Sequence, residues 1–209
     1  LKIKYVAVPA NENSASVFNA ISPNVLIKSD KDSLEKYITE SPSMSPASLA
    51  GAKKIIAKYK NLLDSFEFGV SKQYYQCSVS MGSTCSLSIL RDISSLAVLN
   101  SIVLFKDGKI AEAQDYAQKI IKLGQMLTAQ TNDLISLLTG WVVQKTGYDT
   151  LNRVKSTTVF FANNKNTLIN NLREEHKKVL KFQYSLRLEG IDYITDINKK
   201  PYVATDKET

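Results

Sequence analysis

The chain has 209 residues, of which 44% are hydrophobic and 22% charged, a composition typical of a globular protein. Its net charge of +7 comes mainly from lysine. Only four arginines are present, and arginine is the side chain best suited to bidentate contacts with bases, so specific nucleic-acid binding is not expected. The lysines are interspersed with acidic residues, which predicts only a weak attraction to anionic surfaces. No stretch reaches the roughly 18 apolar residues that span a bilayer, so no transmembrane segment is expected.

The chain is predicted to be all-α. No proline occurs from Met81 to Lys200, and a stretch of that length without a helix breaker favours long helices over a sheet rich in turns. We expect an irregular bundle of about five long helices. Residues 1–45 would form an extended N-terminal segment with short helices, residues 46–192 the helical domain, and residues 193–209 a flexible tail.

The N-terminal segment is predicted to hold two short helices. The first lies near Ser14 to Ala20. The second covers the sequence DSLEKYITE, where Asp32 or Ser33 is the expected N-cap because a short polar side chain can accept a hydrogen bond from the first turn.

The helical domain is expected to begin with one amphipathic helix from Ala47 to Phe66. Apolar residues recur there at spacings of three and four, with lysines on the other face. Pro46 suits the first position of this helix, and Gly69 is a plausible stop.

The next two predicted helices form a hairpin. A helix from about Ser86 to Lys106 is apolar around much of its circumference, which predicts a central position. The sequence DGK turns the chain at Asp107 to Lys109. A third long helix then runs from Ile110 to about Thr128.

A fourth helix, capped by Thr131 or Asn132, carries the most apolar stretch of the chain and is expected to reach Thr150 or beyond, with Gly147 as a place where it ends or bends. A last long helix starts near Asn166. The apolar stretch of the fourth helix contains Leu134, Ile135, Leu137, Leu138, Trp141 and Val142, and we expect Trp141 to lie in the core.

The only two cysteines, Cys77 and Cys85, are separated by the polar sequence SVSMGST. A redox pair usually has the closer C-x-x-C spacing, and a zinc site needs two more ligands whereas the chain has a single histidine. We therefore favour a disulfide, which would stabilise the fold by about 2.6 kcal/mol, over two unpaired thiols. A disulfide indicates a periplasmic or secreted protein. The start at Leu1 instead of methionine is consistent with a removed signal peptide.

The hairpin sequence LAVLNSIVLFKDGKIAEAQDYAQKIIKLG, residues 96–124, resembles one unit of the tetratricopeptide family. Gly108 and Ala113 have the family's spacing between the end of the first helix and the small residue of the second, and Ser101 fits the small position of the first. The resemblance implies two closely packed antiparallel helices. Ile120 stands where the family has alanine, and Gln125 where it has the closing proline. With no second copy evident, we expect a hairpin within a bundle instead of a solenoid.

The longer stretch to residue 151 resembles exported bacterial helical proteins of no established activity, in which a helix pair of this kind precedes a leucine-rich helix. This resemblance brings no catalytic residues with it.

No catalytic motif, cofactor site or metal site is predicted. His176 lies between acidic and basic residues without a second ligand at helical spacing, so a surface histidine is the expected reading, ahead of a metal ligand or a Cys–His pair. Tyr74 and Tyr75, beside the cysteine loop, are candidates either for partner contact or for local packing.

Two functions remain. The first is a non-enzymatic helical binding or scaffold protein of the bacterial envelope or exterior, which holds a protein or peptide in a groove beside the hairpin. The alternative is an exported hydrolase-like enzyme with paired carboxylates in a helical cleft, for which Glu174, Glu175 and Glu189 are the candidates.

Overall fold

The computed structural model describes residues 8–22, 25–76, 87–130 and 134–154, all of which belong to the first of two units, residues 1–156. Among these residues are seven α-helices, two 3-10 turns and no strand, so the all-α prediction is confirmed. The only β-type pairing in this part of the chain is an isolated bridge between Asn13 and Tyr74.

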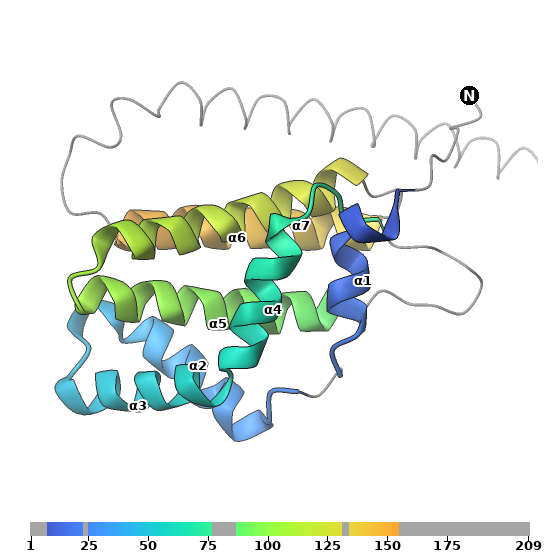
Figure 1. Ribbon diagram of the computed structural model, residues 1–209. Helices are drawn as coiled ribbons and strands as arrows, with labels where there is room; N and C mark the ends of the chain where they lie inside the picture. Colours follow the sequence, from blue (N-terminus) through green and yellow to red (C-terminus); the bar gives the residue numbers. More distant parts are fainter. Residues whose placement is uncertain (1–7, 23–24, 77–86, 131–133, 155–209) are drawn as a thin grey trace, which may run out of the picture. The chain divides into compact units, whose positions relative to one another are not determined.

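Figure 1 shows how the helices are arranged. In chain order they are η1 Ala10–Glu12, α1 Ser14–Asn19, α2 Lys28–Thr39, η2 Ser41–Ser43, α3 Pro46–Lys58, α4 Lys60–Ser71, α5 Leu87–Lys106, α6 Ile110–Gln130 and α7 Leu134–Arg153.

The N-terminal part of the described chain is more helical than predicted. Helix α1 lies where it was expected, but α2 begins four residues before Asp32, so neither Asp32 nor Ser33 is its N-cap. Ile27, with extended backbone angles of −71° and 152°, takes that position without a capping side chain. Asp30 instead lies in the first turn, where its negative charge is favourable next to the exposed N–H groups. The predicted extended segment is not confirmed, since residues 1–7 lie outside the described part.

The predicted helix from Ala47 to Phe66 is in fact two helices, α3 and α4. The break falls at Tyr59, whose backbone leaves the helical region with φ −110° and ψ 27°. Its side chain is buried, and its hydroxyl donates a hydrogen bond of 2.6 Å to Asp30. Because the direction changes here, α4 runs across α5 and α6 instead of continuing along α3 (Figure 1).

The two ends of this helix pair give one confirmed and one wrong prediction. Pro46 is the first residue of α3, and the Ser45 side chain caps it by accepting a hydrogen bond of 3.1 Å from the Ser48 N–H. Gly69 does not stop α4; it lies inside that helix, at a point where a Cβ atom would collide with the ring of Phe18 from α1. The glycine therefore lets α1 and α4 approach closely.

Helices α5 and α6 form the predicted hairpin. Gly108 has a φ of +77°, a conformation that only glycine adopts readily, so the turn at Asp107 to Lys109 is confirmed. Ser101 in α5 donates a buried hydrogen bond of 2.7 Å to the Ala113 carbonyl in α6. The small residues selected from the sequence thus lie where the two helices meet.

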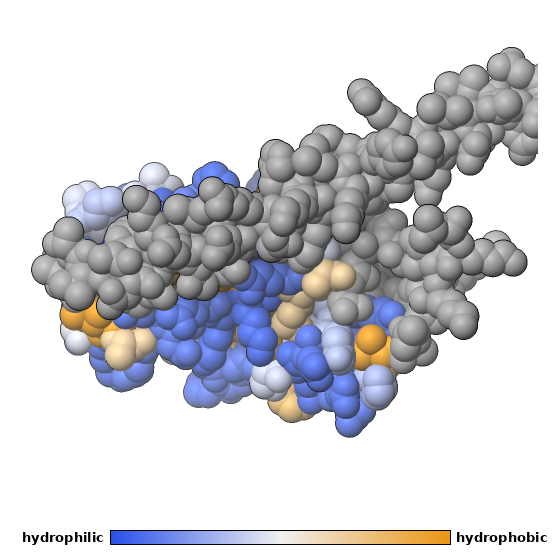
Figure 2. Space-filling view, turned by 90° about the horizontal axis from the view of Figure 1, so that it is seen from above, coloured by the Kyte–Doolittle hydropathy of each residue, from blue (hydrophilic) through white to orange (hydrophobic). Residues whose placement is uncertain are grey.

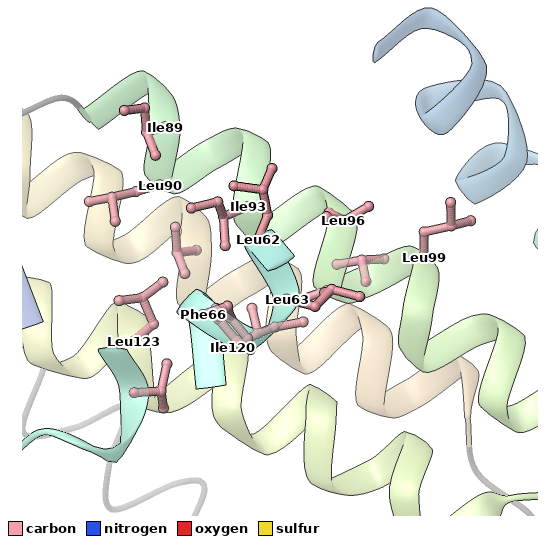
Figure 3. Close-up of a cluster of buried hydrophobic side chains, with 14 of the residues drawn as sticks. Leu62, Leu63, Phe66, Ile89, Leu90, Ile93, Leu96, Leu99, Ile120 and Leu123 are labelled. Carbon is pink, nitrogen blue, oxygen red and sulfur yellow. The ribbon is translucent and has the colours of Figure 1, made fainter. Parts of the chain in front are cut away.

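Helix α5 is the centre of the described fold. It packs against α2, α3, α4, α6 and α7, and most of its apolar side chains are almost completely buried. Figure 3 shows how side chains of α4 and α6 meet those of α5 in one continuous core. The labelled members are Leu62, Leu63 and Phe66 from α4, Ile89, Leu90, Ile93, Leu96 and Leu99 from α5, and Ile120 and Leu123 from α6.

Helix α5 is also long and apolar enough to cross a membrane by length and composition alone, the one such helix among the described residues. Within the structure, 61% of the apolar window is buried against other helices. The central helix of a soluble bundle has the same composition, so this is weak evidence for a membrane span. The expected lack of a transmembrane segment stays a prediction.

Helices α6 and α7 make the most extensive helix–helix contact among the described residues, and glycines bring their backbones together. A Cβ atom on Gly124 would lie 2.6 Å from the Gly140 carbonyl oxygen and 2.6 Å from the Gln144 nitrogen. One on Gly147 would lie 2.8 Å from the Ile121 nitrogen. Gly147 therefore neither ends nor bends α7 in the way the sequence suggested; it lies in the contact, and the helix continues to Arg153.

We expect Gly124→Ala to destabilise the fold by about 1–3 kcal/mol, because the added methyl group meets backbone atoms that cannot move away independently. Alanine is otherwise the better helix former by about 1 kcal/mol. Gly51→Ala in α3 is the matched control: its new methyl group would meet the hydroxyl end of the Tyr37 side chain, which can rotate away. Urea unfolding should give a lower midpoint for Gly124→Ala than for Gly51→Ala, and equal midpoints would contradict the close contact.

A charged cluster joins the start of α2 to the end of α3. Asp30 accepts hydrogen bonds of 2.6 Å from the Lys58 ammonium and 2.6 Å from the Tyr59 hydroxyl. The hydrogen bond from Lys58, followed by that from Tyr59, holds the pKa of Asp30 below its ordinary value of 3.8. The hydrogen bond with Asp30 correspondingly raises the pKa of Lys58. Protonation of Asp30 therefore weakens this connection.

Since the pKa of Asp30 is lower in the folded state, its contribution is fully present above pH 3.8 and is lost as the pH falls through the folded-state pKa. Asp30→Asn should lower the thermal midpoint at pH 7, and the difference from the parent chain should shrink below pH 4. Asp64→Asn, in the exposed pair with Lys60, is the control and should have the smaller effect. Thermal unfolding followed by circular dichroism from pH 2.5 to 7 tests this; a difference that stays constant over the whole range would disprove it.

Candidate functional site

An exposed apolar stripe on α7 is the first candidate for a functional surface. Ile135, Leu138 and Val142 are 67%, 47% and 55% exposed, and their spacing of three and four residues places them on one face of the helix. Leu137 and Val143, on the other side, are buried. The apolar stretch predicted from the sequence thus divides into a buried face and an open face.

Trp141 lies at the border between these two faces and is half-buried, not fully enclosed as predicted. Elsewhere, large exposed apolar side chains are isolated: Phe68 on α4 is 56% exposed but has the Lys72 ammonium 3.9 Å from its ring centroid. Figure 2 shows that the described surface seen from above is mostly hydrophilic, with small separate apolar areas. Among the described residues, Ile135, Leu138 and Val142 are the exposed large apolar side chains that recur at helical spacing, and we name them the α7 stripe.

A pocket of about 290 Å³ is the second candidate, and we name it the helix-end pocket. It lies where the last turns of α5 and α7 meet the 3-10 turn η2. Its walls are apolar, formed by Pro42, Ile102, Phe105 and Val154, and its polar groups are Ser41, Lys106 and Arg153.

The two cations of the helix-end pocket contact neutral oxygens. Arg153 Nη1 donates to the Ile38 carbonyl at 2.9 Å and to the Ser41 hydroxyl at 3.3 Å. Lys106 Nζ lies 3.5 Å from the Pro42 carbonyl. Within the part of the chain that the structure describes, neither forms an ion pair with a carboxylate. The pocket therefore carries a positive charge that its own walls do not neutralise.

The tyrosine pair predicted from the sequence is divided by the fold. Tyr75 is only 3% exposed and packs against Phe18 with ring centroids 6.5 Å apart, which supports the local-packing interpretation for this residue. Tyr74 is half-buried, and its backbone is hydrogen-bonded to Ser14 and Glu12: its carbonyl accepts a 2.8 Å hydrogen bond from the Ser14 N–H, and its N–H donates one of 3.1 Å to the Glu12 carbonyl. Partner contact through Tyr74 stays a prediction.

Several predicted residues lie outside the described part of the chain. Cys77 and Cys85 fall in residues 77–86, so the structure lends the proposed disulfide no support. Also outside are the caps Thr131 and Asn132, the single histidine His176, and the candidate acids of the alternative enzyme function, Glu174, Glu175 and Glu189.

A polar cluster between α4 and α6 is the closest approach to a catalytic arrangement in the described chain. Lys119 lies 3.0 Å from Glu67 and 2.7 Å from Asp115. Burial, together with a hydrogen bond to Glu67, raises the pKa of Tyr116 far above its ordinary value. Burial lowers the pKa of Lys119, but the hydrogen bonds to Asp115 and Glu67 outweigh it and raise the pKa overall. The ion pair between Lys119 and Glu67 thus links α6 to α4.

The described residues contain no group of three or more histidine, cysteine, aspartate or glutamate side chains that could hold a metal ion. On α5, contacts with α2, α3, α4, α6 and α7 bury most of the apolar side chains, and Ile102, Phe105 and Lys106 line the helix-end pocket. The sequence missed the helix-end pocket, since its parts come from residues 41–42, 102–106 and 153–154. Only the basic residues in the last turns of two helices hinted at it.

No protein-family model, no curated protein and no solved structure matches this chain. The resemblance to the tetratricopeptide family therefore rests on the hairpin residues alone.

The disulfide is testable without the structure. If Cys77 and Cys85 are bonded, intact mass spectrometry of the unreduced native protein should give a mass two hydrogens below that of the reduced chain. Reduction should also lower the free energy of unfolding by about 2.6 kcal/mol, the loop-closure value for this spacing. Two sulfurs that both react with iodoacetamide in freshly isolated native protein would rule out the bond and the export argument that depends on it.

Proposed function

We propose that this chain is a non-enzymatic helical binding module that holds a protein partner through the α7 stripe. The observation that carries the proposal is the line of Ile135, Leu138 and Val142, three large apolar side chains about half exposed or more on one helix face. Exposed apolar patches are costly in water, and contiguous ones commonly mark interaction surfaces.

An amphipathic helix of the partner is the occupant that fits this stripe. Side chains at spacings of three and four form a narrow apolar line, which the apolar face of another helix covers along its length. The net charge of +7 favours a partner with acidic residues beside its apolar face, because opposite charges at the rim accelerate association. The proposal places the contact on the outer side of α7 instead of in a groove beside the hairpin, because the exposed apolar side chains at helical spacing lie on α7.

The tetratricopeptide-like hairpin supports this function by its packing. The Ser101–Ala113 hydrogen bond and the turn at Gly108 hold α5 and α6 together, and α6 in turn supports α7. A binding helix that rests on a rigid pair loses little conformational entropy when its partner docks. We further propose a location in the bacterial envelope or exterior, on the strength of the predicted disulfide.

A photo-crosslinking amino acid placed at Leu138 of the full chain tests the occupant in native cells. We expect an adduct that peptide mapping assigns to an amphipathic helix of another protein. The same amino acid at Phe68, which is similarly exposed but isolated, should give no such adduct. An adduct that stays within one chain, or one that joins two copies of this chain, would contradict the proposal.

Affinity gives the quantitative measure once the partner is purified. Leu138→Ser and Val142→Ser should each weaken binding by about 1–3 kcal/mol, or roughly tenfold for each 1.4 kcal/mol, since each removes one buried aliphatic side chain from the interface. Phe68→Ser should leave the dissociation constant unchanged. Leu138→Ser, Val142→Ser and Phe68→Ser all alter exposed positions, so their thermal midpoints should match that of the parent chain. This comparison separates lost binding from lost folding.

A further inference from the structure

We propose that the helix-end pocket binds a carboxylate attached to a small apolar body. The inference goes beyond the partner contact on α7, because it concerns a different surface and a different kind of ligand. Its basis is the combination of four apolar walls with two cations that have no acidic partner among the described residues.

Among the described residues, the acidic side chains next to the pocket in sequence are engaged elsewhere and do not compensate its charge. Asp107, adjacent in sequence to Lys106, pairs with Lys53 at 2.7 Å. Glu40, adjacent to Ser41, lies 3.9 Å from Lys36 and accepts a hydrogen bond of 3.1 Å from the Ser48 hydroxyl. Both of these carboxylates thus have another partner, and so does Asp149, one turn before Arg153, which pairs with Lys145 at 2.7 Å.

Helix-end electrostatics alone does not account for this arrangement. Lys106 and Arg153 both lie in the last turn of a helix, where a cation interacts favourably with the exposed carbonyl groups. That explains why each residue is basic, but not why the two lie on the same hollow with apolar side chains between them. A solvated cation has no need of walls such as Ile102 and Phe105.

The chemistry of the lining defines the ligand. The Arg153 guanidinium is fixed by the Ile38 carbonyl and the Ser41 hydroxyl, so it is held at the pocket before any ligand arrives. Lys106 has only a 3.5 Å contact with the Pro42 carbonyl, so its ammonium is available for a stronger, charge-assisted hydrogen bond. The apolar walls favour an aliphatic or aromatic body, and a volume of about 290 Å³ restricts that body to a small one.

The same chemistry occurs in a free organic acid and in the C-terminal carboxylate of a peptide that ends in an apolar residue. Titration of the full-length, isotope-labelled chain by NMR distinguishes them, with hexanoate representing the free acid and N-acetyl-Ala-Leu the peptide terminus. Hexanamide and N-acetyl-Ala-Leu amide serve as neutral counterparts of the same shape. The ligand that binds more tightly identifies the source, and either result supports the carboxylate site.

We expect at least one carboxylate to shift the signals of pocket residues saturably, and its amide to bind about tenfold more weakly or worse. Lys106→Gln should reduce the affinity about tenfold, and Arg153→Gln should reduce it at least as much. Lys60→Gln, which removes an exposed lysine on α4, is the matched control and should have no effect. Since Arg153 also anchors Ile38, Lys106→Gln is the decisive variant if Arg153→Gln lowers the stability.

Three results would overturn the proposal. One is the absence of saturable shifts for both acids at roughly millimolar concentrations. The second is an affinity for each amide within twofold of that for its acid. The third is an equal loss in Lys106→Gln and Lys60→Gln, which would show that the overall positive charge, not the pocket, attracts the ligand. Substitutions in the α7 stripe should leave this binding unchanged, so the two proposals fail independently.

Discussion

The close contact between α6 and α7 is the constraint on which the rest of the described fold depends. Gly124 and Gly140 leave so little space that a Cβ atom on either would meet the backbone of the opposite helix. A glycine inside a helix lowers helix stability by about 1 kcal/mol relative to alanine. The van der Waals contacts that the close approach of α6 and α7 allows offset this loss. Polar groups in the same contact are paired: Gln144 donates a hydrogen bond of 3.2 Å to Thr128 inside the interface. The hairpin fixes α6 to α5, and the glycine contacts with α6 then set the position of α7.

The same contact divides the side chains of α7 between two surroundings. Gly140 and Gly147 of α7 lie against Leu127 and Ile121 of α6, and Gln144 is buried between the two helices. The large apolar residues of α7 lie partly at this contact and partly on the outer face. Leu137 and Val143 are buried, whereas Ile135 and Val142 are exposed. In an ordinary amphipathic helix the large apolar residues would face the core and the outside would be polar; in α7 part of that pattern is reversed.

Periodicity predicted α5, α6 and α7 from the sequence, because each has its signal within one continuous stretch. The last long helix, predicted from Asn166, lies outside the described residues. The hairpin and the turn at Gly108 followed from local residues alone. The break at Tyr59 did not, because the contact found there is not local: the Tyr59 hydroxyl donates a hydrogen bond to Asp30, which lies 29 residues earlier. The start of α2 was also misplaced. Asp32 and Ser33 are favourable N-cap residues, but the helix begins at Lys28, so both lie inside it. The helix-end pocket was beyond prediction, because three separate segments form it.

Burial of α5 restricts which surfaces of the described helices are open to a ligand. In an open helical repeat, the first helix of each pair presents a face to solvent, and neighbouring repeats extend that face into a groove. Here α2, α3 and α4 cover that face, so the open features lie at the periphery. From Val142 at the end of the stripe to Arg153 at the pocket, α7 rises about 16 Å. A ligand that fits a pocket of about 290 Å³ is too short to cover that distance, so the stripe and the pocket are separate sites.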